Sequence, residues 1–90
     1  MTVLIVDDEV YMVEYIKKLV DWGKYGFNQL LTAGGGSLAR DLIKEHQPEL
    51  LITDIKMPKI SGIDLAQIIA ENSYRTKVII ISGYSDFAFA

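Results

Sequence analysis

The chain has no cysteine, only two prolines and a single histidine among its 90 residues. Without cysteine, disulfide bonds, thiolate metal sites and cysteine nucleophiles are excluded, and this composition is typical of intracellular proteins. The one histidine, His46, stands just before Pro48, where we expect a helix to end and its side chain to be exposed. A lone histidine does not make a metal site.

Basic residues are also scarce, with nine Lys and Arg against twelve Asp and Glu and a net charge of -3. No segment carries a basic run, so we expect no direct nucleic-acid binding by these residues. The apolar runs are too short to span a bilayer, and no basic segment precedes an apolar stretch at the start of the chain. We therefore expect a soluble, cytoplasmic protein that does not bind membranes.

Four short apolar runs recur along the chain, separated by stretches with helical spacing. The runs are Val3 to Val6, Gln29 to Thr32, Leu50 to Thr53 and Val78 to Ile81. The first has no polar position, which is typical of a strand buried on both faces. This alternation predicts an α/β fold in one domain, with a parallel sheet and helices on both of its faces.

The helical stretches each have an apolar side and a plausible end. Met12, Ile16, Leu19 and Val20 show helical spacing in the first. The second helix should carry Leu38, Ala39, Leu42 and Ile43 inward, and the third Leu65, Ile68 and Ile69. The second helix should end near Pro48 and the third near Asn72. The turn-rich segment Asp21–Phe27 holds three aromatic residues, which we expect to pack beneath the edge of the sheet.

Acidic residues follow two of the predicted strands directly. Asp7 and Asp8 follow the first strand, and Asp54 follows the third. Ligands of such sheets bind at the carboxyl ends of the strands, so these carboxylates should lie close together and repel one another. Mg²⁺ prefers oxygen ligands of this kind and would offset the repulsion. The alternative for Asp7 and Asp8 is that they cap the first helix, but this does not account for Asp54.

Asp54 begins a loop, because Ile55-Lys56-Met57-Pro58 follows it. A carboxylate beside a bound cation can act as a nucleophile toward a phosphoryl group, and the product would be an aspartyl phosphate. Ser82, after the fourth strand, offers a hydroxyl for a hydrogen bond to a phosphoryl oxygen, although a serine in this place is commonly a turn former.

Three segments resemble the receiver domains of two-component response regulators in order, spacing and strand context. They are Leu4-Ile5-Val6-Asp7-Asp8-Glu9, Ile52-Thr53-Asp54-Ile55-Lys56-Met57-Pro58 with Gly62 beyond it, and Ile80-Ile81-Ser82-Gly83. The resemblance covers the whole chain and implies a flavodoxin-like (CheY-like) parallel sheet with strand order 2-1-3-4. It also implies that residues 1–90 form a receiver domain that is incomplete at its carboxyl end. The fifth βα unit is missing, and with it the lysine that contacts the phosphoryl group in the family.

The resemblance assigns roles to individual residues. It implies that Asp54 is the phosphoacceptor, that Asp8 and Asp54 bind Mg²⁺ directly and that Asp7 binds it through water. The backbone carbonyl of Lys56 would complete the protein ligands, and the Ser82 hydroxyl would move toward the phosphate. The donor would be a sensor histidine kinase, and the domain would catalyse only its own phosphorylation and dephosphorylation, without being an enzyme for another substrate.

Two further segments, Asp21–Phe27 and Ser82–Phe87, resemble the branch of receivers joined to AraC-type helix-turn-helix output domains. DNA would then be bound only through an output domain outside these residues, as part of transcription regulation. The family more often has a single glycine and an acid where this chain has Gly34-Gly35-Gly36. With the fourth strand at an edge, we expect a chain ending at Ala90 to form dimers or larger oligomers, with Phe87 and Phe89 in the contact.

Two other functions fit parts of the sequence. Gly34, Gly36 and Ala39 match a dinucleotide-binding fingerprint, with Asp54 as the ribose-binding acid. However, Asp7 and Asp8 would then be unexplained, and their charge would disfavour a pyrophosphate. An aspartate-nucleophile phosphatase shares the acidic cluster, but it needs a second acid two positions after the nucleophile, where this chain has Lys56.

Overall fold

The computed structural model describes residues 1–81, so the predictions for Ser82, Phe87 and Phe89 lie outside the described residues. Its elements, in chain order, are β1 Thr2–Val6, α1 Val10–Leu19, the 3₁₀ helix η1 Trp22–Tyr25, β2 Gln29–Ala33, α2 Gly36–His46, β3 Leu50–Asp54, α3 Gly62–Glu71 and β4 Lys77–Ile81. The strands form one sheet in the order β2-β1-β3-β4, and every neighbouring pair is parallel. The flavodoxin-like fold and the strand order predicted from the sequence are confirmed.

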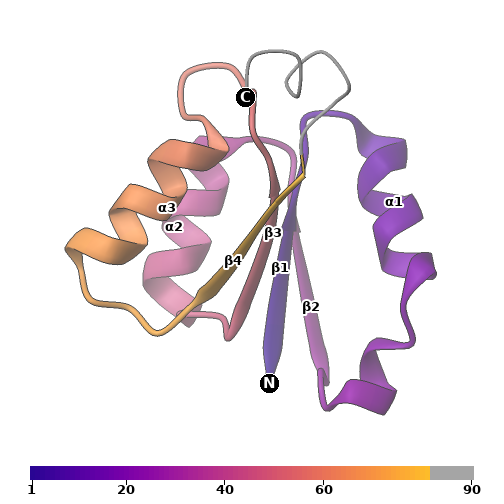
Figure 1. Cartoon of the computed structure of the whole chain (residues 1–90). Helices are drawn as coiled ribbons and strands as arrows, with labels where there is room; N and C mark the ends of the chain where they lie inside the picture. The colour runs from indigo at the N-terminus through magenta and orange to yellow at the C-terminus, as the bar shows by residue number, and fades with distance from the viewer. Residues whose placement is uncertain (82–90) are drawn as a thin grey trace.

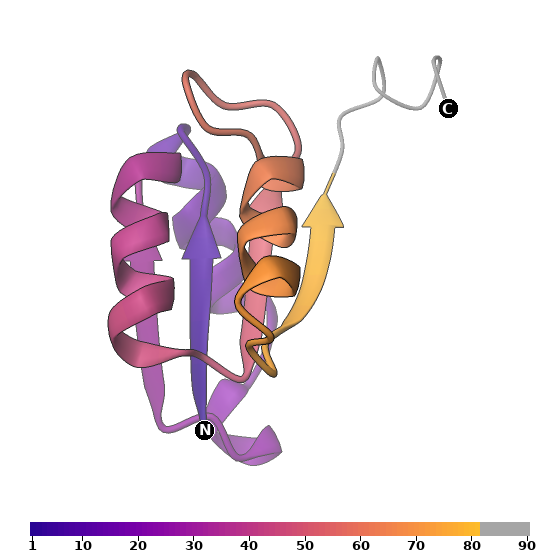
Figure 2. The ribbon, with the colours of Figure 1, turned by 90° about the vertical axis from the view of Figure 1, so that its left-hand side faces the viewer.

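The sheet lies between two helical layers, with α1 on one face and α2 and α3 on the other (Figure 1 and Figure 2). Strand β1 is central and its residues Val3, Leu4, Ile5 and Val6 are at most 1% exposed, as a strand buried on both faces requires. Alternate residues of β1 serve the two layers, because successive strand side chains point to opposite faces. Leu4 and Val6 pack with α2 and α3, whereas Val3 and Ile5 pack on the α1 side.

Most of the predicted inward residues of the helices are in the core, but Leu38 is not. Leu65 and Ile69 of α3 and Ala39 and Ile43 of α2 are buried. Leu19 is 62% exposed, because α1 ends at this residue and its buried stripe is formed by Val13 and Ile16. Leu38 is 51% exposed, because the inward face of α2 is the stripe of Gly36, Ala39 and Ile43. The prediction for Leu38 was therefore wrong.

The aromatic segment after α1 packs through two of its three rings. Trp22 is buried, and its ring meets that of Phe27 edge to face, with 5.7 Å between the centroids. Gly26 ends η1 with a φ of 89°, in the left-handed region that glycine adopts without strain. Tyr25 is 61% exposed, so the prediction that all three aromatic residues pack beneath the sheet is wrong for Tyr25.

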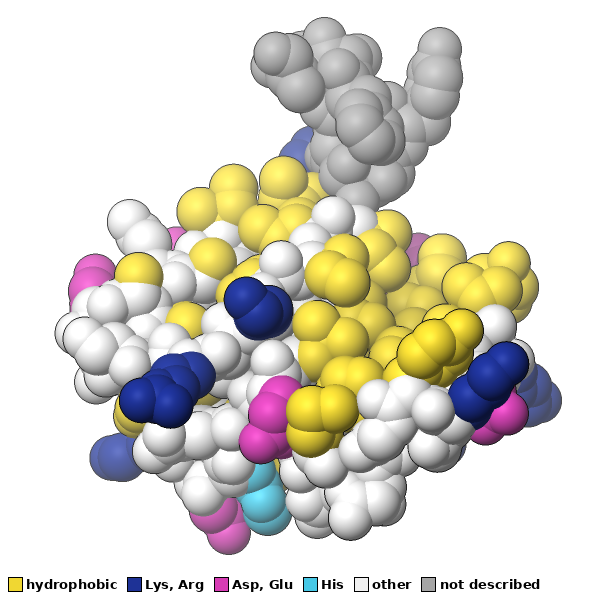
Figure 3. Space-filling view, turned by 60° about the horizontal axis from the view of Figure 1, so that its bottom comes forward, with side chains coloured by type: hydrophobic (Ala, Val, Ile, Leu, Met, Phe, Trp, Pro, Cys, Tyr) yellow, Lys and Arg dark blue, Asp and Glu magenta, His cyan; other side chains and the backbone are white. Residues whose placement is uncertain are grey.

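Strand β4 is the outer strand on the side of β3, and within residues 1–81 it pairs with β3 alone. Ile79, Ile80 and Ile81 are 37% to 49% exposed, while Val78 is half-buried against the core. Figure 3 shows hydrophobic side chains gathered over a broad area of one side of the molecule. The exposed edge expected from the sequence is confirmed for these isoleucines, and self-association through it stays a prediction.

Two smaller expectations concern the helices. His46, the last residue of α2, is exposed as expected. None of the helices in residues 1–81 combines the length and the apolar character needed to cross a membrane.

Helix α3 begins at a reciprocal hydrogen-bonded cap. The Ser61 hydroxyl accepts the backbone N–H of Asp64 at 3.1 Å, and an Asp64 carboxylate oxygen accepts the backbone N–H of Ser61 at 2.9 Å. Both bonds satisfy N–H groups that a helix start leaves unpaired. The cap fixes where the loop after β3 ends.

Replacing Ser61 by alanine should lower the free energy of unfolding by about 1 kcal/mol, because it removes this cap. Urea unfolding followed by circular dichroism measures the change. Ser37→Ala is the matched control, since Ser37 lies exposed in the first turn of α2, whose start has no side-chain cap. Equal losses in the two variants would contradict a specific role for the cap.

Candidate functional site

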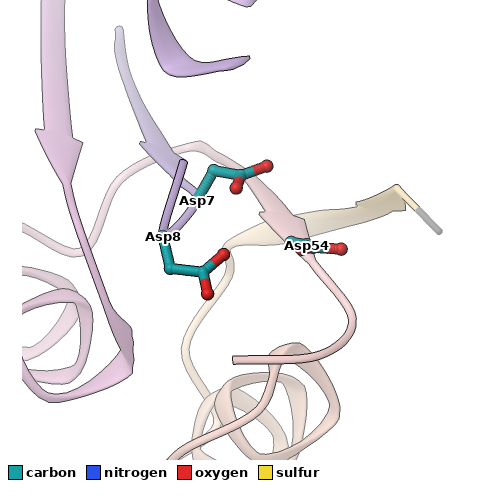
Figure 4. Close-up of side chains that lie close together, drawn as sticks. All are labelled: Asp7, Asp8 and Asp54. Carbon is teal, nitrogen blue, oxygen red and sulfur yellow. The ribbon is translucent and has the colours of Figure 1, made fainter. Parts of the chain in front are cut away.

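The strand register places the acidic residues side by side. In the parallel pair of β1 and β3, Val6 lies opposite Thr53, so Asp7 and Asp54 follow at the same edge of the sheet. Asp7, Asp8 and Asp54 each offer a carboxylate oxygen, and these oxygens all lie within 4.8 Å of one another. Figure 4 shows the three side chains together at the ends of the two strands. The structure thus brings together the three carboxylates that the sequence singled out.

Backbone N–H groups hold two of the carboxylates in place. Asp7 Oδ1 accepts the N–H of Glu9 at 2.9 Å, and Asp54 Oδ1 accepts the N–H of Ile55 at 2.8 Å. Residue Glu9 is itself the N-cap of α1, and this cap has no side-chain hydrogen bond. The alternative that Asp7 and Asp8 cap the first helix is therefore wrong, and their carboxylates lie toward Asp54.

Electrostatic repulsion is built into this cluster. Asp7 is only 6% exposed, and this burial is the main reason why its pKa is raised above the ordinary value. The nearby charges of Asp54 and Asp8 raise the pKa further, whereas the hydrogen bond from the Glu9 N–H lowers it. The three carboxylates lie close together and offer only oxygen atoms as ligands, which matches the preference of Mg²⁺ for hard ligands. The residues present therefore fit the metal that the sequence suggested.

The loop from β3 to α3 is pressed tightly against its neighbours at two glycines. A Cβ atom added at Gly62 would lie 2.2 Å from the carbonyl oxygen of Asp54, and one added at Gly36 would lie 2.4 Å from that of Ile60. Within the loop, Ile60 donates its N–H to the carbonyl of Pro58 at 2.8 Å, around Lys59 with a φ of 70°. Few non-glycine residues adopt this left-handed conformation, which is found more often near functional sites.

These contacts bear on the dinucleotide-binding alternative. Because Gly36 lacks a side chain, α2 can approach Ile60 closely. The space beside Gly36 is thus taken by another part of the protein and not left for a ligand. In a dinucleotide fingerprint, the equivalent closeness serves the approach of a pyrophosphate. Asp7 and Asp8 lie beside Asp54, where their charge would repel such a ligand. The geometry disfavours that function.

The structure shows where Lys56 and Lys77 lie, but it does not test the predicted roles of Ser82 and Lys56. Ser82 lies outside the described residues, so its role stays a prediction. Lys56 follows the site in the loop with an exposed side chain, and the role of its carbonyl also stays a prediction. Lys77 pairs with Leu50 at the start of β3, whereas Asp54 pairs with Ile81, so Lys77 lies at the opposite edge of the sheet from the acidic cluster.

One polar residue beside the site was not singled out from the sequence. Thr53 is fully buried next to Asp54, and its hydroxyl donates to the Asp54 carbonyl at 2.9 Å. The only signal in the sequence was a hydroxyl residue ending an apolar run, which strand propensity alone explains.

A family model described as "Response regulator receiver domain" matches residues 3–90. The chain belongs to this family. As a receiver domain, it resembles the transcriptional regulatory protein HptR of Staphylococcus aureus, with 47% identity over 87 residues that make up 97% of this chain and 34% of that protein. The receiver thus spans about a third of the length of this curated relative.

Solved structures give the same result. A two-component transcriptional regulator, AraC, from Clostridium phytofermentans is 33% identical with a TM-score of 0.86, covering 100% of this chain and 73% of that one. The receiver domain of AraT, a response regulator from Geobacillus stearothermophilus, is 31% identical with a TM-score of 0.90, covering 98% of this chain and 68% of that one. The likeness of this receiver to AraC-type regulators, expected from two of its segments, is confirmed.

Replacing Asp7 by asparagine should stabilise the metal-free receiver at neutral pH. Asparagine keeps an oxygen for the Glu9 N–H but removes a buried charge. A carboxyl group with a raised pKa in the folded state binds its proton more tightly there than in the unfolded chain, so stability falls as the pH rises above 3.8 and through the raised pKa. In urea unfolding, the advantage of Asp7→Asn should be full at pH 7 and shrink as the pH is lowered toward 3.8. A lower midpoint at pH 7 would contradict this cause.

Proposed function

We propose that this receiver domain accepts a phosphoryl group on Asp54 from a sensor histidine kinase and thereby switches an output. The observation that carries the proposal is the convergence of Asp7, Asp8 and Asp54 at the carboxyl edge of the sheet. Asp54 is the half-buried end of β3, and the other two acids directly follow β1, the strand beside it. This arrangement supplies one nucleophile and a set of metal ligands in a single place.

In the proposed reaction, a carboxylate oxygen of Asp54 attacks the phosphorus atom of the donor. A P–O bond to Asp54 forms while the bond from phosphorus to the leaving group breaks, and the leaving group departs with the electron pair. The leaving group is a histidine nitrogen of the kinase or, with a small donor such as acetyl phosphate, acetate. The product is an acyl phosphate on Asp54.

Mg²⁺ is the cofactor that this donor set fits. Asp8 and Asp54 would bind it directly, Asp7 through water, and the backbone carbonyl of Lys56 would complete the protein ligands. When bound, the ion neutralises charge on the phosphoryl group. The buried Asp7 charge and its repulsion by Asp54 and Asp8 mean that a cation is favoured here more strongly than at an isolated surface carboxylate.

The lack of an acid near Asp54 in the loop supports signalling over phosphatase turnover. Position 56, two residues after the nucleophile, is a lysine, so the loop offers no carboxyl group there to act as general acid and base. An acyl phosphate on Asp54 would persist, and the domain would act on no substrate other than itself. By similarity to HptR and AraC, whose names describe transcriptional regulators, the output would be a DNA-binding domain outside these residues, in the cytoplasm.

The assignment of Asp54 predicts labelling at one residue. With Mg²⁺ and acetyl phosphate, intact mass spectrometry should show the addition of one phosphoryl group, and Asp54→Ala should abolish it. Asp41→Ala is the matched control, because Asp41 is an exposed aspartate of α2, and this variant should be labelled like the unchanged protein. An adduct that survives Asp54→Ala, or that maps to a serine or histidine, would refute the assignment.

Replacing Asp8 by alanine separates metal binding from nucleophilic attack. Asp8 is exposed and contributes a carboxylate oxygen to the cluster, but it is not the proposed nucleophile. We expect Asp8→Ala to weaken Mg²⁺ binding by at least roughly 10-fold, the loss typical of a residue that only supports a ligand, and to slow labelling of Asp54 without moving the label elsewhere. Calorimetric titration with Mg²⁺ measures the first effect and timed mass spectra the second. Unchanged Mg²⁺ affinity would remove Asp8 from the ligand set.

A further inference from the structure

We infer that Thr53 is a positioning residue for Asp54: its buried hydroxyl fixes the Asp54–Ile55 peptide group, and the N–H of that group holds the Asp54 carboxylate. This inference rests on the proposed role of Asp54 as the phosphoacceptor. Thr53 itself does not touch the donor in this account, and it acts only through the backbone of its neighbour.

The first step is the placement of Thr53. It is 0% exposed, and its side chain lies on the face of the sheet covered by α3, since its Cγ2 atom would be 3.0 Å from a Cβ atom added at Gly62. A hydroxyl removed from water in this way needs a hydrogen-bond partner, or its burial is costly. Thr53 finds that partner in the carbonyl oxygen of Asp54, at 2.9 Å.

The second step is the peptide group that this bond holds. Its carbonyl belongs to Asp54 and its N–H to Ile55, and the N–H donates to Asp54 Oδ1 at 2.8 Å and to the Ile81 carbonyl at 3.2 Å. A single planar peptide therefore joins the Thr53 hydroxyl to the carboxylate. Hydrogen bonds in such a chain polarise and strengthen one another. Fixing the carbonyl end fixes the direction in which the N–H points.

The third step is the consequence for the nucleophile. With Oδ1 held by the Ile55 N–H, the rotation of the carboxylate is restricted and Oδ2 is the oxygen left for attack on phosphorus. Holding the attacking atom in a reactive orientation lowers the barrier, because less freedom is lost on the way to the transition state. Gly62 completes the arrangement, since its missing side chain leaves room for the Asp54 carbonyl that Thr53 holds.

Three substitutions of Thr53 isolate the hydroxyl. Thr53→Val keeps the shape of the side chain and removes the donor. Thr53→Ser and Thr53→Ala differ from each other only in the hydroxyl, so this pair gives the same comparison if the valine variant folds poorly. Thr76→Val is the matched control, because Thr76 is also buried and its hydroxyl donates to a backbone carbonyl, that of Pro48, at 2.5 Å and at the opposite edge of the sheet.

The test is the rate of labelling by acetyl phosphate with saturating Mg²⁺, measured over a range of donor concentrations. We expect the maximal rate to fall about fivefold to tenfold in Thr53→Val, and by a similar factor in Thr53→Ala relative to Thr53→Ser, with the half-saturating donor concentration unchanged. Thr53→Ser and Thr76→Val should stay within about twofold of the unchanged protein. If the labelling rate fell only because removing a buried hydroxyl destabilises the domain, Thr76→Val would be labelled more slowly as well.

A second measurement follows the peptide group directly. Hydrogen exchange of the Ile55 amide, observed by NMR in the absence of donor, should become faster in Thr53→Val and stay as it is in Thr76→Val. Labelling of Thr53→Val at the full rate, or unchanged exchange at Ile55, would overturn the inference about Thr53 and leave Asp54 as the phosphoacceptor. Failure of the unchanged protein to be labelled on Asp54 would instead refute the proposed function.

Discussion

The site depends on the complete burial of β1 between the two helical layers. Because Val3 to Val6 are at most 1% exposed, the strand cannot slip by one residue without moving its apolar side chains to the wrong layer. That constraint fixes the register in which Val6 lies opposite Thr53. The acids that follow β1 and end β3 are therefore forced into one small region, in spite of their mutual repulsion. The packing energy of the core sustains an electrostatically unfavourable cluster, which a cation can relieve.

Much of this could be predicted from the sequence, because it follows from strong and local patterns. The apolar run before Asp7 and the one before Asp54 indicate buried parallel strands, and parallel strands end at the same edge. The convergence of the carboxylates thus needs no knowledge of side-chain packing. Ser61 and Asp64 are likewise an S-x-x-D cap signal that can be read from spacing alone. These features can be predicted because a different arrangement of the same residues would lose several interactions at once.

Other features depend on how elements approach one another, and periodicity does not contain that information. Leu38 fits an apolar helical face, yet the contact of α2 with the loop at Ile60 selects the stripe that begins at Gly36. The glycines were visible as letters, but a glycine that serves close packing and one that serves a ligand look alike in a sequence. Thr53 was overlooked for a related reason, since a hydroxyl at the end of an apolar strand acquires a role only once its partner carbonyl is known.

The loop after Asp54 is held in place at several points along its length. Its first peptide is held by Thr53, its end by the cap at Ser61, and Ile60, just before that cap, packs against Gly36. Closely packed regions do not deform gradually, because small shifts open voids or create clashes. A change at the Asp54 carboxylate therefore cannot be absorbed by the first peptide alone. It must either be resisted by the whole loop or displace the contacts with α2 and α3 together, and this cooperative behaviour is what a two-state switch requires.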